Sequence, residues 1–331
     1  MDEHFIIETE KLKETWQKHK GSILRDYLVK DVEDPRINVQ SILTRHWMIK
    51  ELFGDTYEDL MEHEIRFALV MNWLLTLLKK NVRTGQLQAI LYSLIEKQKD
   101  AEGIEIPSYV SETFSRLAMP NYICGALNLP ASDSADGIIP EYLVSTFSRV
   151  WKEMLVCEEH KKISVLEPAC GSANDYRFIH AFGISRFLDY TGFDLSEKNV
   201  RNAKTMFPDV NFKVGNAIEI QGEDKEFDYC FVHDLFEHLS IDAMERSISE
   251  ICRVTKKGIC AGFFNMHDGC EHIVREVNSY HWNKLSRDKM KTLFEKKFSD
   301  IEVIHIDSYL ISKYGFSDTH NKGACTLIAR V

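Results

Sequence analysis

The sequence predicts an α/β fold with a parallel sheet in its second half, preceded by an all-α region. Three observations support this fold class. From residue 163 onward, short apolar segments alternate with amphipathic helices, as a parallel α/β sheet requires. Residues 4–119 show helical periodicity and few strand signals. Residues 125–140 are rich in Gly, Pro, Ser and Asp, so we predict a boundary there between a helical domain, 1–137, and a second domain, 138–331.

The helical half contains two clear helix candidates. Asp55 and Glu58 have the spacing of a capping box at the start of the first helix. Apolar residues then recur along one face at intervals of three, four and seven: Leu60, Phe67, Met71, Leu74 and Leu78. The second candidate helix covers residues 86–97. These patterns predict a small helical bundle.

Seven segments of the second half have the length and apolar character of strands. They are residues 163–167, 187–193, 211–214, 227–232, 258–264, 301–306 and 325–329. Between them, Ser196 and Ser240 are placed to cap helices that carry apolar residues on one face. Crossover helices of this kind cover a parallel sheet, so we expect helices on both of its faces.

The net negative charge of the chain argues against nucleic acid as a partner. The 331 residues include 51 acidic and 41 basic side chains, and the formal net charge is -10. No run of Lys or Arg is dense enough to follow a phosphate backbone. We therefore expect no nucleic acid substrate.

Cysteine spacing and hydropathy point to the cytoplasm. The eight cysteines are scattered without a CxxC pair, which argues against a structural zinc site or a disulfide framework. The opening residues are acidic and polar, unlike a secretory signal, and the longest apolar stretch, residues 67–78, is too short to span a bilayer. The expectation is a cytoplasmic protein without a membrane partner.

The strongest chemical signal is the run Val165-Leu166-Glu167-Pro168-Ala169-Cys170-Gly171-Ser172-Ala173, in which a strand ends in an acid before a turn of small residues. It resembles motif I of class I S-adenosylmethionine-dependent methyltransferases, a strand, an acid and a turn of the type Gly-x-Gly-x-Gly. Gly171 matches the central glycine, while Ala169 and Ala173 stand at the outer positions. Alanine permits close approach of a ligand where the backbone does not need positive φ. The resemblance implies that Glu167, Ala169 and Gly171 bind the cofactor.

Later segments follow the order of that family. Thr191-Gly192-Phe193-Asp194-Leu195-Ser196 resembles motif II, where an acid accepts hydrogen bonds from both ribose hydroxyls, which implies this role for Asp194 beside Leu195. Asn216, followed by Ala217, stands where the family binds the adenine amino group. Phe227-Asp228-Tyr229-Cys230-Phe231-Val232 and Leu235-Phe236-Glu237-His238-Leu239 resemble the fourth strand and the stretch after it, with His233 between them as a further cofactor contact.

The resemblance covers residues 163–330 and implies a seven-stranded Rossmann-like methyltransferase sheet with S-adenosylmethionine as cofactor. Taken singly, Glu167 or Asp194 could be an ordinary capping acid; their common order and spacing favour the cofactor interpretation. A nicotinamide-binding Rossmann domain is disfavoured because Gly-x-Gly-x-x-Gly is absent and because the last two strands resemble the methyltransferase family's terminal hairpin.

Methyl transfer to an alcohol or phenol needs a group that removes a proton, and histidine titrates near neutrality. His233 follows the fourth strand and His267 the fifth, where a parallel sheet opens its ligand crevice, so each is a candidate base. His281 and Trp282 are further candidates for the lining of this crevice.

A magnesium site is an alternative interpretation of the same loops. Asp234, Asn265 and Asp268 supply hard oxygen ligands at the positions where some superfamily members hold magnesium. Asp and Asn are also common in solvent-exposed loops, which is the simpler explanation of these three residues, so we assign no metal ligand.

The function predicted from the sequence is methyl transfer to an oxygen or nitrogen of a small molecule, with a specialised metabolite among the candidates. In this family the helical half typically covers the acceptor pocket or builds a dimer, so a homodimer is also considered. One alternative is methylation of a peptide or protein side chain. Another is a non-catalytic, S-adenosylmethionine-binding regulatory protein, which only the reduced glycine count of motif I supports.

Overall fold

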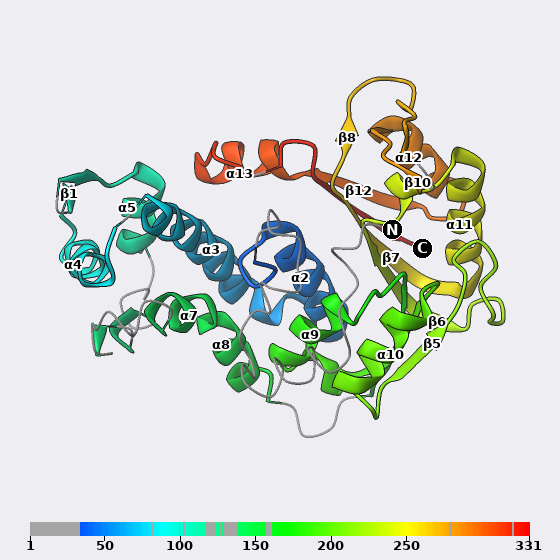
Figure 1. The fold of residues 1–331 in the computed structure, drawn as a ribbon, viewed down its shortest axis with the longest axis horizontal. Helices are drawn as coiled ribbons and strands as arrows, with labels where there is room; N and C mark the ends of the chain where they lie inside the picture. Colours follow the sequence, from blue (N-terminus) through cyan, green and yellow to red (C-terminus); the bar gives the residue numbers. More distant parts are fainter. Residues whose placement is uncertain are drawn as a thin grey trace.

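The computed structural model describes residues 34–331, apart from positions 81, 99, 102, 117–122, 126, 129–137, 157–160, 278–279 and 320. Helices come first along the described chain, and strands alternate with helices after them (Figure 1). The boundary predicted between residues 137 and 138 lies at the edge of a stretch outside the described residues, so it stays a prediction.

The main sheet of the second half has seven strands in the order β12-β13-β7-β6-β3-β4-β5, and two two-stranded sheets accompany it. Its strands are β3 (Ile163–Pro168), β4 (Leu188–Asp194), β5 (Asn211–Val214), β6 (Phe227–His233), β7 (Thr255–Phe263), β12 (Asp300–His305) and β13 (Cys325–Arg330). The five strands from β3 to β7 run parallel, and β13 pairs antiparallel with both β7 and β12. All seven predicted strands and the terminal antiparallel pair are confirmed.

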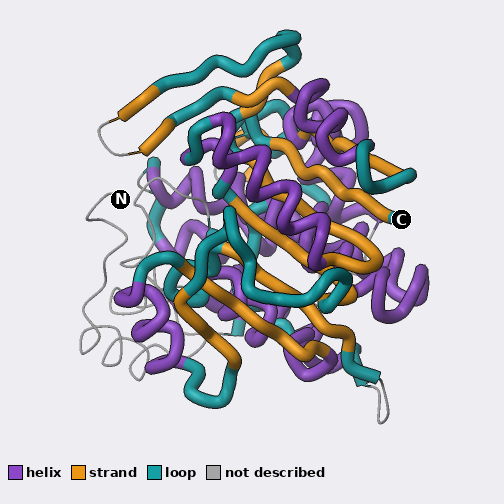
Figure 2. Tube along the Cα trace, turned by 90° about the vertical axis from the view of Figure 1, so that its right-hand side faces the viewer, coloured by secondary structure: helices purple, strands orange, loops and turns teal. Residues whose placement is uncertain are grey.

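Helices cover both faces of the sheet (Figure 2). Alternate residues of β6 point to opposite faces, so Phe231 packs in one hydrophobic core and Val232 in the other. The core of Val232 includes residues of α11 (Ile241–Val254) and α12 (Arg287–Glu295). The core of Phe231 includes residues of α9 (Asn174–Ala181) and α10 (Glu197–Met206). Ser196 caps α10 and Ser240 caps α11, as predicted.

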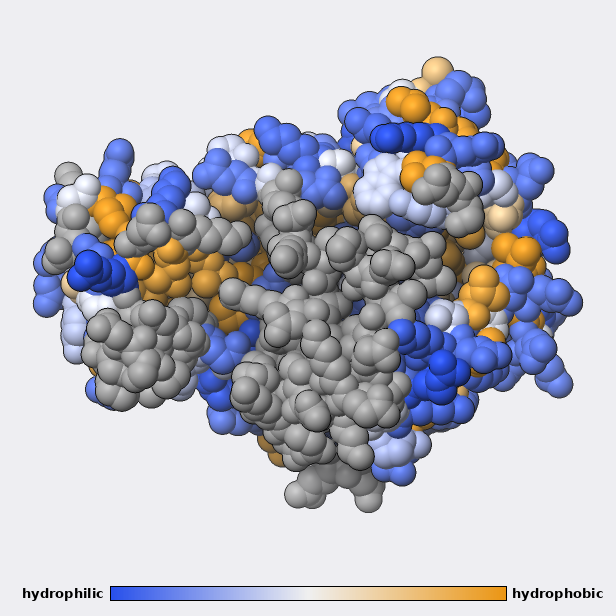
Figure 3. Space-filling view, viewed as in Figure 1, coloured by the Kyte–Doolittle hydropathy of each residue, from blue (hydrophilic) through white to orange (hydrophobic). Residues whose placement is uncertain are grey.

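The described residues of the N-terminal half are almost entirely helical. It comprises α2 (Val39–Phe53), the 3₁₀ turn η3 (Gly54–Tyr57), α3 (Glu58–Lys79), α4 (Thr84–Ile95), α5 (Ser108–Arg116), α7 (Ile138–Val144) and α8 (Thr146–Met154). A short antiparallel pair, β1 (Asp100–Ala101) and β2 (Ile104–Glu105), interrupts it. On the face shown in Figure 3, hydrophobic side chains gather over α3, while most of the other described surface is hydrophilic.

The predicted capping box at the start of α3 is wrong. Helix α3 begins at Glu58 without a side-chain cap, and Asp55 lies in the preceding 3₁₀ turn. The ammonium group of Lys50, one turn before the end of α2, pairs with Asp55 (3.3 Å) and with Glu58 (3.0 Å). Asp55 and Glu58 therefore stabilise the turn between α2 and α3 and do not form a capping box at the start of α3.

Helix α2 packs directly on the sheet, against β7 and β13. Trp47 of α2 meets Tyr229 of β6 edge to face, with ring centroids 5.6 Å apart. A buried network ties α2 to the rest of the helical half, because the Glu64 carboxylate of α3 takes hydrogen bonds from Arg45 (2.8 Å), His46 (2.7 Å) and Trp151 of α8 (2.6 Å). One hydrophobic core therefore continues from the sheet into the helices.

Within the stretches of chain that the structure describes, every helix is too short or too polar to cross a bilayer.

Candidate functional site

The loop between β3 and α9 has an unusual backbone. Ala169 (φ 57°), Gly171 (φ 55°) and Ala173 (φ 63°) all lie in the left-handed region. The condition under which alanine suits these positions, a backbone without positive φ, is therefore met at neither Ala169 nor Ala173. A left-handed alanine costs roughly 1–2 kcal/mol, so the surrounding contacts must hold the loop in this shape.

Asp194, the last residue of β4, connects this loop with the loop after β4. Its Oδ2 accepts the backbone N–H of Gly171 (3.0 Å), while Oδ1 accepts the N–H of Ser196 (2.8 Å) and the side-chain amide of Asn199 (3.1 Å). A carboxylate offers about four acceptor positions, so three are in use and room for about one further donor remains. Asp194 is thus placed at the carboxyl end of β4 and oriented by the loops on either side of it.

Glu167 lies below the loop, fully buried, and not on its surface. The hydroxyl of Tyr190 donates a hydrogen bond to its carboxyl group. Burial, with the nearby charges of Asp175 and Asp194, raises the pKa of Glu167 well above its usual range. The structure therefore shows Glu167 as a buried acid at the end of β3, before the loop, while a direct contact with a ligand stays a prediction.

Apolar side chains are exposed at the carboxyl ends of β4 and β5. Leu195, directly after Asp194, is 68% exposed, and Val214, the last residue of β5, is 51% exposed. Asn216 is exposed nearby and its Oδ1 accepts the N–H of Ile218 (3.1 Å), which leaves one acceptor position on that oxygen. Ala217 is half-buried. Exposed apolar surface beside hydrogen-bonding groups suits a flat ligand with a polar edge.

His233 has both ring nitrogens engaged. Nδ1 lies 3.1 Å from the Asp175 carboxylate of α9, and Nε2 lies 2.8 Å from the hydroxyl of Thr44 on α2. Burial opposes protonation of the ring, but the attraction of Asp175 prevails and raises the pKa of His233. Below this ring is Gly262 of β7, where a Cβ atom would lie 2.3 Å from His233 Cδ2. His233 is therefore a fixed link between α9, β6 and α2.

His267, in the short strand β8 (Met266–His267), accepts the N–H of Gly269 at Nδ1 (3.0 Å). The proton of the neutral ring must then be on Nε2, which is buried without a hydrogen-bond partner among the described residues. A ring with this arrangement presents a donor and no free lone pair.

The residues considered for magnesium are not brought together as a ligand set. Asp268 forms an ion pair with Arg287, and the side-chain amide of Asn265 donates to the carbonyl of Asn283 (2.9 Å). Asp234 follows β6 with positive φ and an exposed side chain. In the described ranges of the chain, no group of three or more His, Cys, Asp or Glu side chains could hold a metal ion.

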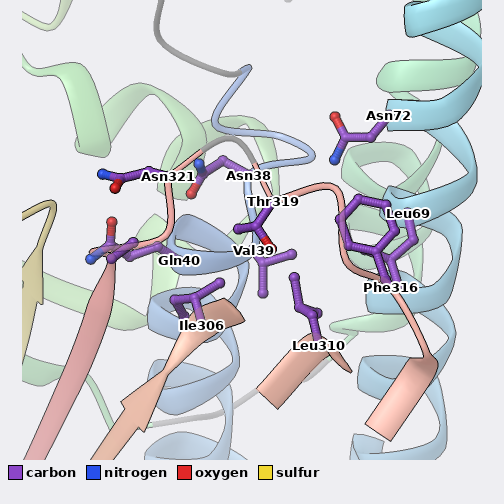
Figure 4. Close-up of a pocket in the computed structure, with 11 residues that line it drawn as sticks. Asn38, Val39, Gln40, Leu69, Asn72, Ile306, Leu310, Phe316, Thr319 and Asn321 are labelled. Atoms are coloured by element: carbon purple, nitrogen blue, oxygen red, sulfur yellow. The ribbon is translucent and has the colours of Figure 1, made fainter. Parts of the chain in front are cut away.

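A pocket lies between the start of α2, α3 and α13 (Ile306–Tyr314) (Figure 4). Gln40 forms one wall and donates its amide hydrogens to the carbonyls of Phe263 (3.0 Å) and Cys325 (2.8 Å), so the pocket adjoins the end of β7. Its lining combines amide or hydroxyl side chains with apolar ones and includes no charged residue: Asn38, Val39, Gln40, Leu69, Asn72, Ile306, Leu310, Phe316, Thr319, Asn321 and Ala324.

Three groups at this end of the sheet escape prediction from the sequence. Asp175 could have been found, because an acid in the first turn of the helix after motif I is close to that loop by connectivity. Thr44 and Gln40 carry no local signal, since their roles depend on the packing of α2 on a strand more than 180 residues away.

A match to a known protein family lies in the second half of the chain. Residues 165–258 match a protein-family model described as a methyltransferase domain. No curated protein matches the chain.

Solved structures resemble the chain only distantly. An S-adenosylmethionine-dependent methyltransferase from Mesorhizobium loti is 14% identical, with a TM-score of 0.41 over 55% of this chain and 96% of its own. One from Methanosarcina mazei is 16% identical, with a TM-score of 0.39 over 52% of this chain and 93% of its own. The 1,6-didemethyltoxoflavin-N1-methyltransferase of Burkholderia thailandensis, with bound 1,6-didemethyltoxoflavin and S-adenosylhomocysteine, is 14% identical, with a TM-score of 0.39 over 55% of this chain and 77% of its own.

Proposed function

We propose that this chain, a class I S-adenosylmethionine-dependent methyltransferase, transfers the methyl group to an oxygen or nitrogen of a small molecule. The observation that carries the choice of a small acceptor is the uncharged pocket beside the end of β7. An acidic open cleft would have favoured a peptide, whereas a pocket of amide and apolar side chains suits a neutral small molecule.

The crevice at the carboxyl ends of β3, β4 and β5 has the chemistry that the cofactor needs. Small residues line the loop at Ala169 and Gly171, Asp194 keeps an acceptor position, and Leu195 offers apolar surface beside it. We assign Asp194 to the ribose, Leu195 and Ala217 to the adenine ring, and Asn216 to the adenine amino group. When bound, the cofactor supplies a methyl group that is already activated for transfer.

Glu167 and His233, the other residues predicted to contact the cofactor, are assigned an indirect role through the loop between β3 and α9. Glu167 is assigned to support of the loop as a buried acid, and burial raises its pKa. His233 holds α9, which follows the loop, through its contact with Asp175. Both assignments predict that substitution changes cofactor affinity indirectly.

The helical half contributes to selection of the acceptor, since α2 and α3 supply part of the pocket lining. Asn72 of α3 and Asn38 at the start of α2 stand on different sides of the pocket, with Thr319 between them (Figure 4). We infer that an acceptor is read mainly by hydrogen bonds to neutral groups. Dimerisation through the helical half stays a prediction.

The catalytic base was predicted to be His233 or His267. In the structure, Thr44 occupies the second nitrogen of His233, and His267 presents a donor, so both need a rearrangement before either accepts a proton. His233→Ala and His267→Ala, assayed at saturating cofactor, test these roles directly. Full turnover in both variants would exclude both residues as the base.

The acceptor class is tested by incubating the protein with radiolabelled S-adenosylmethionine and either a small-molecule extract or a tryptic peptide mixture. Label in the small-molecule fraction supports the proposal. Label in peptides alone would contradict it and favour a peptide or protein methyltransferase. Asn72→Leu serves as a pocket variant, and should reduce labelling without changing cofactor affinity.

A further inference from the structure

Four aromatic rings gather where β6 and β7 end. His238 of the 3₁₀ turn η6 (Phe236–His238) lies 5.3 Å from Phe264, 5.8 Å from Tyr280 and 5.3 Å from Trp282, measured between ring centroids. Phe264 and Trp282 are themselves 4.9 Å apart. A cluster that only fills a core would be buried, yet all four side chains reach the surface, and Trp282 is 43% exposed.

Buried polar contacts hold these rings in place. Asn283, which follows Trp282 and is fully buried, donates its backbone N–H to the carbonyl of Glu237 (2.9 Å) and its side-chain amide to the carbonyl of Leu239 (2.7 Å). The Glu237 carboxyl group in turn accepts the backbone N–H of Phe264 (2.8 Å). The segments that carry His238, Phe264 and Trp282 are therefore fixed to one another before any ligand binds, which lowers the entropic cost of binding.

The proton of His238 is fixed as well. Nδ1 lies 3.1 Å from the backbone carbonyl of His281, which can only accept, so Nδ1 carries the proton. Burial lowers the pKa of His238, which favours the neutral ring. Nε2 then keeps its lone pair and has no hydrogen-bond partner among the described residues. Neither His233 nor His267 presents such a nitrogen.

We propose that His238 and its three aromatic neighbours extend the acceptor site beyond the pocket of Figure 4, whose lining residue Asn321 donates its side-chain amide to the carbonyl of Phe264 (2.5 Å). This extension would take a planar aromatic ring whose hydroxyl or N–H group donates to Nε2 of His238. This inference rests on the proposed methyl transfer and narrows its acceptor. The exposed ring faces supply stacking surface, and Nε2 supplies a directional contact to the hydroxyl or N–H group. In the proton step, the acceptor's O–H or N–H bond breaks, its electron pair stays on that atom, and the Nε2 lone pair binds the proton. The product of this step on the protein is an imidazolium cation.

The test uses two probes, 2-naphthol and 2-methoxynaphthalene, titrated into protein saturated with S-adenosylhomocysteine. The wild type should bind 2-naphthol about three- to tenfold more tightly, the effect of one neutral hydrogen bond. His238→Phe should remove this difference. His238→Asn, whose amide can still donate to the His281 carbonyl, should remove it too and controls for folding. Trp282→Leu should weaken both probes about two- to tenfold, as expected for one lost aromatic contact.

Tyr92→Leu, an exposed aromatic residue on α4, is the matched control and should bind both probes like the wild type. The inference is overturned if the cofactor product binds but neither probe does, if the two probes bind equally well to the wild type, or if Trp282→Leu changes nothing. Failure of S-adenosylhomocysteine itself to bind overturns the proposed function, which is measured first and separately.

Discussion

The Asp194 carboxylate accepts the backbone N–H of Gly171 at 3.0 Å, which joins the two loops that follow neighbouring parallel strands. The contact fixes the glycine turn and orients the carboxylate at once. Gly171 also has positive φ, so the same turn needs both a permissive backbone and an acceptor opposite its N–H.

Asp194→Ala should weaken S-adenosylmethionine binding at least about tenfold, because a hydrogen bond to a charged group is lost and the Gly171 turn is released. Calorimetric titration measures the affinity. Asp189→Ala, an exposed acid on the same strand, is the matched control and should bind like the wild type. Unchanged affinity in the Asp194 variant would remove the ribose assignment.

Ala169→Gly should stabilise the protein, by up to about 1 kcal/mol. Glycine removes the strain of roughly 1–2 kcal/mol that a left-handed alanine carries. It also makes the unfolded chain more flexible, which lowers the stability of the folded protein by about 0.4–1 kcal/mol and offsets part of the gain. Chemical denaturation measures the free energy of unfolding. The control, Ala203→Gly within α10, should cost about 1 kcal/mol or more. A clear loss of stability on Ala169→Gly would show that the loop does not need this backbone.

Gly262→Ala should destabilise the protein by about 1–3 kcal/mol through overpacking. The new methyl group would lie 2.3 Å from His233 Cδ2 and 3.0 Å from Gln40 Nε2. His233 cannot move aside easily, because Asp175 and Thr44 hold its ring. Gly85→Ala in α4 meets no neighbouring atom and should cause no loss. Equal stability of the two variants, compared by thermal unfolding, would contradict the fixed position of His233.

Glu237 predicts a pH dependence. Burial, with repulsion from Asp234, raises its pKa from 4.5 to about 8, so the folded protein binds more protons than the unfolded chain between these values. This contribution to stability is complete below about pH 4.5 and is lost as the pH rises towards 8. Glu237→Gln keeps an acceptor for the Phe264 N–H and cannot ionise. Its free energy of unfolding, relative to the wild type, should rise between pH 5 and pH 8.

The control for that series is Glu245→Gln on the exposed face of α11, whose difference from the wild type should stay constant with pH. A constant difference for Glu237→Gln as well would mean that Glu237 is ionised in the folded protein throughout the range.

The sheet could be predicted from the sequence because each strand is a short apolar segment bounded by polar residues, which is a local signal. The serine caps at Ser196 and Ser240 are local signals too. The spacing of Asp55 and Glu58 led to a wrong prediction, because both carboxylates pair with the ammonium group of Lys50 instead of forming a capping box. Sequence spacing does not reveal which partner a carboxylate finds.

The site was predictable in outline only. Asp194 and Gly171 stand at the carboxyl ends of two predicted strands, so the sequence placed both at the same edge of the sheet, where they form a hydrogen bond. The left-handed alanines were not, since backbone conformation is imposed by the loop as a whole. The free nitrogen of His238 depends on the carbonyl of His281, 43 residues later, and no periodicity encodes such a contact.

The central claim is that the crevice at Asp194 binds S-adenosylmethionine. Calorimetric titration of the wild type with S-adenosylmethionine, and separately with S-adenosylhomocysteine, tests it most directly. Micromolar binding of both compounds is expected, which corresponds to a free energy of about -8 kcal/mol. No heat at two temperatures, together with no thermal shift for either compound, would contradict it.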